Sequence, residues 1–454
     1  MYRFPALVFF ILIQIGLMWV GIMADPILII GIPIIGLITI WLIYNPSMSL
    51  LLLALTGIVK GFLINIIPIF EVIDYTLLFT ILIWIGLFRI YFVGKWKIPD
   101  WSKILLGLYL LFSIILFFSG FYTPSPNYGW QKIMRFIVFN TTMFITPFII
   151  VKNIGDSKRL LLLFRNILMV IVVTMMGYIL YFLTISSGVS LLIRVSILGA
   201  NPITVGSFLG IGAGMMVILI NRSAYKHWII YMPILWILII AIIATGSRGP
   251  LLSFLFGVLL FGIFFENVNQ KRLLFFFLFS IIILVIALFL LPENLTGRYL
   301  NYTTGDLVIQ REGVKRVSTI AMRLQYWGLS ITEWLRNIKT VLIGVGSGGF
   351  SSFYILRDYK FYPHNMFVEV LLELGLIGLS LFFLFWYKIT KILFYIKKVE
   401  NISIISAMWI VATIISLLGA QFSGDINGNR VVWMFAAIAL SSVYYEVINN
   451  EQFA

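Results

Sequence analysis

The feature that most constrains the fold of this chain is a series of long apolar segments that recurs along its 454 residues. A helix needs about 20 mainly apolar residues to cross the ~30 Å hydrocarbon core of a bilayer, and many of these segments are that long. Charged residues make up only 11% of the chain, against about 25% in a soluble domain. The sequence therefore predicts an all-α, polytopic integral membrane protein.

The apolar segments predict about 12 to 14 membrane-spanning helices, the lower number applying if early segments merge or re-enter the membrane. The segment 47–68 is the weakest, because Lys60 and Gly61 interrupt it. The predicted spans are 4–23, 26–44, 47–68, 75–93, 103–120, 133–151, 161–185, 203–220, 228–244, 250–265, 273–291, 364–387, 403–420 and 431–447.

The positions of the basic residues set the predicted orientation of these helices. A formal net charge of +15 could indicate a nucleic-acid partner. However, the basic residues cluster in short loops that alternate along the chain, as cytoplasmic loops do in membrane proteins. We therefore expect no nucleic-acid partner, and we place both termini in the cytoplasm. The cytoplasmic loops then hold 17 of the 32 basic residues: Arg3, Arg89, Lys95, Lys97, Lys103, Lys152, Lys158, Arg159, Arg165, Arg222, Lys226, Lys271, Arg272, Lys388, Lys391, Lys397 and Lys398.

One long polar segment, 292–363, interrupts the apolar pattern and is predicted to lie on the extracytoplasmic face. We expect its part 321–340 to form a surface helix that packs over the ends of the spans. The glycine-rich stretch Gly344–Gly349 lacks the lysine of a phosphate-binding loop, so we expect a flexible turn there. The chain thus divides into helices over 1–202, helices over 203–291, the loop 292–363 and helices over 364–454.

Arg248 is a candidate phosphate ligand, because it lies in a turn at the predicted extracytoplasmic interface. Glycines on both sides, Gly246 and Gly249, allow the backbone to turn tightly. A guanidinium can make paired hydrogen bonds to phosphate oxygens. The competing interpretation is an anchor that extends to the lipid headgroups.

His364 is a candidate general base at the end of the long loop. It precedes an apolar helix, whose positive dipole end favours the neutral imidazole that a base requires. The competing interpretation is a residue that caps the helix. The only other histidine, His227, lies beside Lys226 in a predicted cytoplasmic loop and suggests no such role.

Glu369 and Glu373 lie one turn apart near the start of the same helix. Carboxylates at such a depth are costly and take part in function or in a pair. They could orient His364, pair with an outer arginine, or hold two helices together. We favour the last of these.

Two further arginines, Arg135 and Arg194, are candidates for additional phosphate contacts, whereas Arg323 has no such indication from its position. Arg323 is one of nine basic residues in the long loop, and composition alone suggests a solvated side chain. Arg135 and Arg194 lie in or near the outer halves of spans. The sequence contains no cluster of acids and histidines on the predicted outer face, so we expect no metal and no cofactor, and guanidinium groups would stabilise a leaving diphosphate instead.

Several short motifs together resemble the O-antigen ligase and O-antigen polymerase superfamily of bacterial membrane glycosyltransferases. They occur in the expected order over about 200–390, and the remaining helices are similar only in hydropathy. The motifs are Asn201-Pro202, Thr245–Gly249, Met322–Trp327, Gly344–Phe350, His364–Glu369 and Leu374–Gly378.

The resemblance implies a class C-like, metal-independent glycosyltransferase in the bacterial plasma membrane, with its active site on the extracytoplasmic face. It implies that Arg248 and Arg323 hold the diphosphate of an undecaprenyl-linked glycan and that His364 is the base. Further substrate contacts would come from Arg135, Arg194, Glu369 and Asn365. The implied partners are the polyprenyl-linked donor, a glycan or lipid-linked glycan acceptor, membrane lipids and a chain-length regulator.

The expected reaction is a single displacement that inverts the anomeric carbon, most consistent with polymerisation of O-antigen, capsule or exopolysaccharide repeat units. A ligase that joins the glycan to a terminal lipid acceptor remains an alternative. A lipid-linked oligosaccharide flippase is an alternative of another class. Transporters tend to show internal repeats and broken helices with charge at mid-membrane depth, and neither is evident in the sequence.

Overall fold

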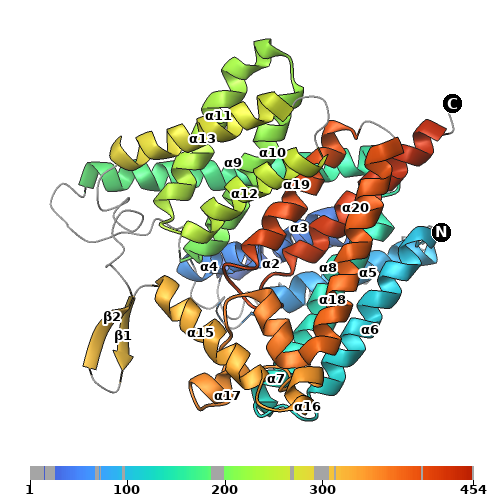
Figure 1. Ribbon diagram of the computed structural model, residues 1–454. Helices are drawn as coiled ribbons and strands as arrows, with labels where there is room; N and C mark the ends of the chain where they lie inside the picture. The colour runs from blue at the N-terminus through green and yellow to red at the C-terminus, as the bar shows by residue number, and fades with distance from the viewer. Residues whose placement is uncertain are drawn as a thin grey trace.

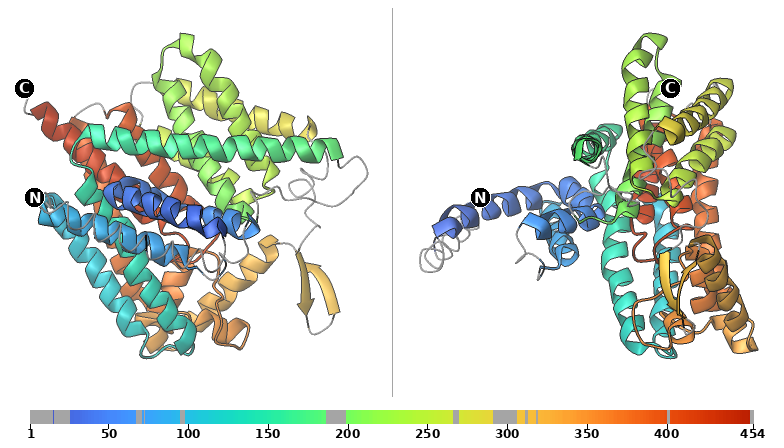
Figure 2. Two further views of the ribbon diagram at one scale, coloured as in Figure 1. Left: turned by 180° about the vertical axis from the view of Figure 1, so that it is seen from behind. Right: turned by 90° about the vertical axis from the view of Figure 1, so that its left-hand side faces the viewer.

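Over the residues that the structure describes, the chain forms a bundle of helices with one two-stranded hairpin (Figures 1 and 2). The hairpin pairs β1 (Asp306–Gln310) with β2 (Gly313–Val317) in antiparallel register. The prediction of an all-α membrane protein is confirmed apart from this hairpin. The computed structural model describes residues 15, 26–66, 71, 73–94, 98–185, 199–265, 270–290, 306–310, 313–317, 319–399 and 402–451.

The helices follow the predicted spans closely, because long apolar runs are a local signal of helix position. The predicted span 47–68 is divided into two helices. The predicted span 133–151 starts earlier, because the helical segment there runs from Pro126 to Ile150. The helices before the long loop are α2 (Pro26–Tyr44), α3 (Pro46–Ala54), α4 (Thr56–Ile66), α5 (Tyr75–Phe92), α6 (Lys103–Ser119), α7 (Pro126–Arg135), a π-helix (Phe136–Asn140), α8 (Thr141–Ile150), α9 (Ile154–Ile185), α10 (Pro202–Arg222), α11 (Trp228–Ala244), α12 (Arg248–Phe265) and α13 (Gln270–Leu290).

The long loop contains more structure than the one surface helix predicted over 321–340. The helices of this part and of the C-terminal part are α15 (Thr319–Trp334), α16 (Ile338–Ile343), α17 (Phe350–Tyr354), α18 (Met366–Val399), α19 (Ile404–Gly419) and α20 (Val431–Glu451).

Seven helices of the described residues are long and apolar enough to cross a membrane. The number becomes eight if α2 and α3, which meet at an angle of 104°, count as one span. Shorter apolar helices are α11, α19 and most of α20. The first predicted span, 4–23, lies outside the described residues except for Ile15, so the total of 12 to 14 stays a prediction.

The predicted cytoplasmic loops contact one another at one end of the helix bundle, and the predicted extracytoplasmic loops contact one another at the other end. At one end, the side chain of Arg159 donates to Asn45 and that of Arg89 donates to the carbonyl of Tyr44, each at 3.4 Å. At the other end, the amide of Met366 donates to the carbonyl of Ala420 at 3.2 Å. We call this second end the loop end. It also carries α15, α16, α17 and the start of α7 (Figure 1).

Helix α18 is broken at Gly375, which has a φ of 63° inside the helical segment. The amides of Val345 and Gly346 donate to the carbonyls of Leu372 and Glu373 at 2.9 and 3.0 Å. Carbonyls next to the break are therefore satisfied by the loop, as backbone groups at membrane depth must be. The break allows the segment after α16 to enter between α18 and the loop before α7.

Candidate active site

The backbone at His364 is held in an unusual conformation by several elements. His364 has a φ of 60°, which is rare for a residue other than glycine. On one side, the indole of Trp327 in α15 donates to the carbonyl of Pro363 at 3.1 Å. On the other side, Asn365 accepts from the amide of Val368 at 3.0 Å and donates to the carbonyl of Gln421 at 3.2 Å. Such strain persists only where surrounding contacts fix it, and it is concentrated at functional sites.

The imidazole of His364 lies among aromatic rings and makes no hydrogen bond with any other described residue. Its Nδ1 atom is buried without a partner. The ring centroids of Tyr362, Tyr326 and Phe361 lie 4.6, 6.1 and 6.5 Å from that of His364. The ring is thus held among aromatic side chains. Because Nδ1 is buried, Nε2 is the nitrogen that a ligand can reach.

The surroundings keep this imidazole neutral. Burial, followed by the positive charge of Arg323, lowers the pKa of His364 to about 4, and the negative charge of Asp425 opposes this only in part. In the structure, burial and the nearby Arg323 favour the neutral imidazole of His364. The sequence analysis expected the dipole of the following helix to have this effect. A neutral imidazole can accept a proton at neutral pH.

Arg323 lies on α15, is half-buried, and makes no hydrogen bond or ion pair with another described residue. Burial lowers the pKa of its guanidinium. A half-buried cation without a counter-ion is costly unless an anion pairs with it. Because its charge also acts on His364, the structure brings together two residues that the sequence could connect only through the family resemblance.

Arg248 is the first residue of α12, at the same end of the bundle. A Cβ atom on the adjacent Gly249 would lie 3.0 Å from Cβ of Phe422. The residue before Phe422, Gln421, accepts from Asn365 and also from the amide of Phe367. The start of α12 and the start of α18 therefore contact the same short segment, which places Arg248 near the turn that carries His364.

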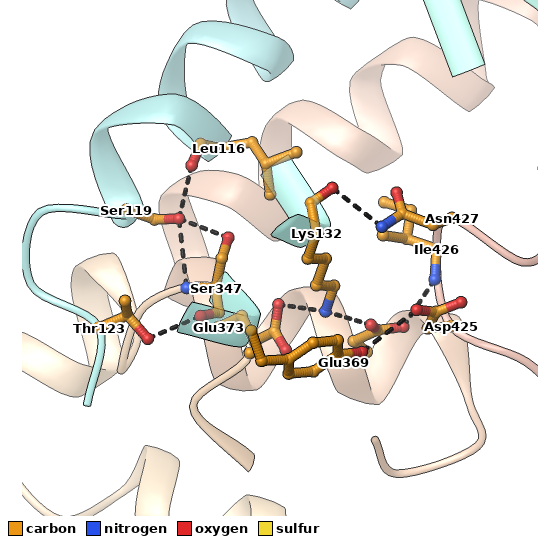
Figure 3. Close-up of polar contacts among 12 residues, drawn as sticks. Leu116, Ser119, Thr123, Lys132, Ser347, Glu369, Glu373, Asp425, Ile426 and Asn427 are labelled. Atoms are coloured by element: carbon orange, nitrogen blue, oxygen red, sulfur yellow. Dashed lines mark hydrogen bonds and ion pairs between the residues drawn. The ribbon is translucent and has the colours of Figure 1, made fainter. Parts of the chain in front are cut away.

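A buried ion cluster involves the first turns of α18, which follow His364 in the chain, and Figure 3 shows its polar contacts. Glu369 and Glu373 of α18 both pair with the ammonium group of Lys132 from α7, and all three side chains are almost completely buried. The interpretation that the glutamates hold two helices together fits this arrangement. Lys132 was missed, although two carboxylates at helical spacing in an apolar segment required a cation.

The same cluster fixes the loop between α19 and α20. Glu369 accepts from the amide of Ile426 at 2.9 Å, and Asn427 donates to the carbonyl of Lys132 at 2.9 Å. Asp425 accepts from the hydroxyl of Tyr128 at 3.2 Å. No local sequence pattern indicates the role of this loop, because its partners lie more than 50 positions away along the chain.

The expectation of a flexible turn at Gly344–Gly349 is wrong, because this segment is buried. A Cβ atom on Gly344 would lie 2.3 Å from the carbonyl carbon of Glu373, and one on Gly346 would lie 2.6 Å from Cα of Thr123. Both glycines also have positive φ angles, of 74° and 96°. The glycines are needed because the backbone passes closely between α18 and the loop before α7.

Of the two remaining candidate arginines, Arg135 and Arg194, the structure describes only Arg135. Arg135 is exposed at the end of α7, where its positive charge acts on the half-buried Arg430 just before α20. Burial lowers the pKa of Arg430 to about 10, Arg135 acts in the same direction, and Asp74 and Asp425 oppose it. Arg194 lies outside the described residues.

Comparison with known protein families gives one match. The family model described as O-antigen ligase matches residues 233–383. A comparison with curated proteins gave no match. The matched segment includes Arg248, Arg323 and His364, so the family model covers the three residues that the sequence motifs and the geometry of the loop end both select.

Proposed function

Because the chain belongs to the O-antigen ligase and polymerase superfamily, we propose that it transfers a polyprenyl-diphosphate-linked glycan to an acceptor hydroxyl. One observation carries this proposal. A neutral histidine without a hydrogen-bond partner lies beside a half-buried arginine without a counter-ion among the described residues. A base and an unpaired cation are the two groups that such a transfer requires.

Arg323 and Arg248 are the proposed ligands of the donor diphosphate. Charge grows on the diphosphate oxygen as its bond to the anomeric carbon breaks, and fixed cations stabilise that charge in a site that excludes water. Planar guanidinium groups match the geometry of phosphate oxygens. The half-buried position of Arg323 strengthens its interaction with an anion.

His364 is the proposed general base. It would take the proton of an acceptor hydroxyl as the oxygen attacks the anomeric carbon, while the bond to the diphosphate breaks and its electron pair leaves with the phosphate oxygen. Attack from the face opposite the leaving group inverts the anomeric configuration. The positive φ of His364 and the contacts at Pro363 and Asn365 support a fixed direction for the base.

The proposed location is the bacterial plasma membrane, with the loop end facing the extracytoplasmic side and both termini in the cytoplasm. The positive-inside distribution of the short loops supports this orientation. It also agrees with the sorting of the predicted outer loops to one end of the structure. A polyprenyl-linked donor would then enter from the outer leaflet, with its lipid tail between helices.

A polymerase of surface polysaccharide repeat units is our preferred form of this function, and a ligase is the alternative within the family. A polymerase extends one lipid-linked glycan with another and works together with a chain-length regulator. Product length separates the two, because a polymerase gives a ladder of products and a ligase gives one transfer to a terminal lipid.

A transporter of lipid-linked oligosaccharides is the second candidate, and one observation favours it more than the sequence did. The expectation that broken helices and buried charge are absent is wrong, since α18 is broken at Gly375 and a charged cluster is buried beside it. Transporters use such features to bind substrates at mid-membrane depth. Here the charges of the cluster, Lys132, Glu369 and Glu373, pair with one another, whereas His364 and Arg323 make no hydrogen bond or ion pair with another described residue.

The test is glycan transfer by the purified protein in detergent, without vesicles, using its lipid-linked repeat unit as donor. We expect turnover by the wild type and a fall of about 10²–10⁴-fold in His364→Ala, the usual contribution of a general base. His227→Ala is the matched control, because it removes the other histidine at the opposite end. Wild-type activity in a well-folded His364→Ala protein would remove His364 from the mechanism, and no turnover by wild type would favour the transporter.

A further inference from the structure

Tyr362 has an arrangement unlike that of the other buried tyrosines at the loop end. It is half-buried two positions before His364, and the two ring centroids are 4.6 Å apart, with the planes inclined at 59°. Its hydroxyl makes no hydrogen bond with any other described residue. By contrast, Tyr128 donates to Asp425 at 3.2 Å, and Tyr122 donates to the carbonyl of Ile343 at 2.6 Å.

A tyrosine hydroxyl in such a position normally finds a partner, because its apolar ring is buried while its polar end requires a hydrogen bond. Burial, together with the negative charges of Asp425 and Glu369, raises the pKa of Tyr362. The phenol therefore stays protonated and can donate a hydrogen bond throughout the physiological pH range. The neighbouring His364 also makes no hydrogen bond with a described residue, so two polar side chains without such a partner have ring centroids 4.6 Å apart.

The charged groups near the two side chains differ and indicate which part of a substrate each would bind. Arg323 acts on His364 more strongly than Asp425 does, and this cation would attract a diphosphate. Near Tyr362 the negative charges of Asp425 and Glu369 outweigh the positive charge of Lys132, and the amide of Ile426, next to Asp425, donates to Glu369 at 2.9 Å. A ligand of Tyr362 should therefore be uncharged and rich in hydroxyl groups, which is the chemistry of a sugar ring.

We propose that Tyr362 binds the acceptor sugar, with its hydroxyl donating to a sugar oxygen next to the hydroxyl that His364 deprotonates. This inference rests on the proposed transferase function and assigns the acceptor subsite of that reaction. The ring of Tyr362 would contact the apolar face of the sugar, a nitrogen of His364 would face the reacting hydroxyl, and the diphosphate of the donor would lie beside Arg323.

Tyr362→Phe tests the proposal, because it removes one hydroxyl and keeps the ring. The acceptor would be an alkyl glycoside of the repeat-unit oligosaccharide, prepared from the host's own polysaccharide, which carries hydroxyls but no diphosphate leaving group. We expect KM for this acceptor to rise about 2- to 12-fold, the effect of one net hydrogen bond, with KM for the lipid-linked donor unchanged. Tyr359→Phe is the matched control, since Tyr359 is exposed on the same segment.

An unchanged KM for the acceptor in Tyr362→Phe, or a change confined to the donor, would overturn the proposal. Direct binding of the alkyl glycoside, followed by saturation-transfer NMR, separates this failure from failure of the transferase function. If wild type binds the glycoside and Tyr362→Phe binds it several-fold more weakly, the sugar subsite stands even where turnover is absent. Equal binding by both proteins excludes the subsite.

Discussion

The cluster around Lys132 and the site around His364 are neighbours, because Glu369 of the cluster follows His364 by only five positions in the sequence. The two regions nevertheless differ in whether their polar side chains have partners. In the cluster, Lys132 pairs with Glu369 and Glu373, and every charged group has a partner of opposite charge. In the site, His364 and Arg323 make no hydrogen bond with other described residues. Burial alone therefore does not indicate function here; the pairing of the buried group does.

The largest effect that this comparison predicts is on stability, in Lys132→Met. The substitution leaves two buried carboxylates without their cation, and breaking a buried ion pair in this way costs about 3–5 kcal/mol. The loss also removes the support for the loop at Ile426, so activity should fall with stability. Reversible denaturation in detergent, or a thermal melt of the purified protein, measures the change.

Two controls sharpen this prediction. Lys103→Met removes an exposed ion pair with Asp100 and should change stability little, because water solvates both groups. Lys132→Met combined with Glu369→Gln and Glu373→Gln removes all three charges together and should recover much of the loss. If the single Lys132→Met protein is as stable as wild type, the cluster is not the structural element that we infer.

The helices could be predicted from the sequence, whereas the cluster could not. Each long apolar segment predicts one helix from local sequence alone. The ends of α5, α6 and α10 to α12 therefore lie within a few residues of the ends of the predicted spans. The partner of Glu369 is 237 positions away in the chain, and pairing at that separation leaves no local pattern. The break at Gly375 could not be predicted either, because the amides that satisfy the carbonyls beside it come from Val345 and Gly346, about 30 positions earlier in the chain.

The site was predicted only in part, for a related reason. Arg248 and His364 were identifiable because each lies where a predicted span begins or ends. By composition Arg323 was one basic residue among nine in the loop, and the family resemblance alone distinguished it. The fold adds that α15, which carries Arg323, contacts the turn at His364. Tyr362 carries no sequence signal, because its unpaired hydroxyl is apparent only once its neighbours are known.

Arg323→Ala should produce the next largest effect, on activity instead of stability. Loss of one fixed cation at a leaving group costs about 10²–10³-fold in rate, by analogy with donors that stabilise an oxyanion. Because the guanidinium is half-buried and has no counter-ion among the described residues, its removal should leave the thermal stability of the substrate-free protein unchanged or slightly higher. Initial rates of transfer and a thermal melt of the same preparation measure both quantities.

Arg336→Ala is the matched control for Arg323→Ala. Arg336 follows α15, is exposed, and lies 3.6 Å from the carboxylate of Glu333, so its loss should change neither rate nor stability appreciably. A large loss of stability in Arg323→Ala would place Arg323 with Lys132 among the structural charges, and the distinction between the two regions would fail.

The smallest effect concerns pH, and it tests the interaction of Arg323 with His364. His364 must be neutral to act as a base, and its pKa of about 4 keeps it neutral from neutral to mildly acidic pH. On the acidic side of the pH profile, we expect kcat/KM for wild type to be constant down to about pH 5. Well below pH 4 it should fall tenfold for each pH unit. Removing the cation in Arg323→Gln should raise the pKa of His364 and move this limb to higher pH.

The profile of kcat should differ from that of kcat/KM, because the former reports the pKa of the substrate complex and the latter that of the free enzyme. A bound diphosphate neutralises Arg323 and adds negative charge, so it should raise the pKa of His364 in the complex. The acid limb of kcat in wild type should therefore approach that of kcat/KM in Arg323→Gln. Identical limbs in wild type and Arg323→Gln would show that Arg323 does not act on His364, and the assignment of both residues to one site would then be wrong.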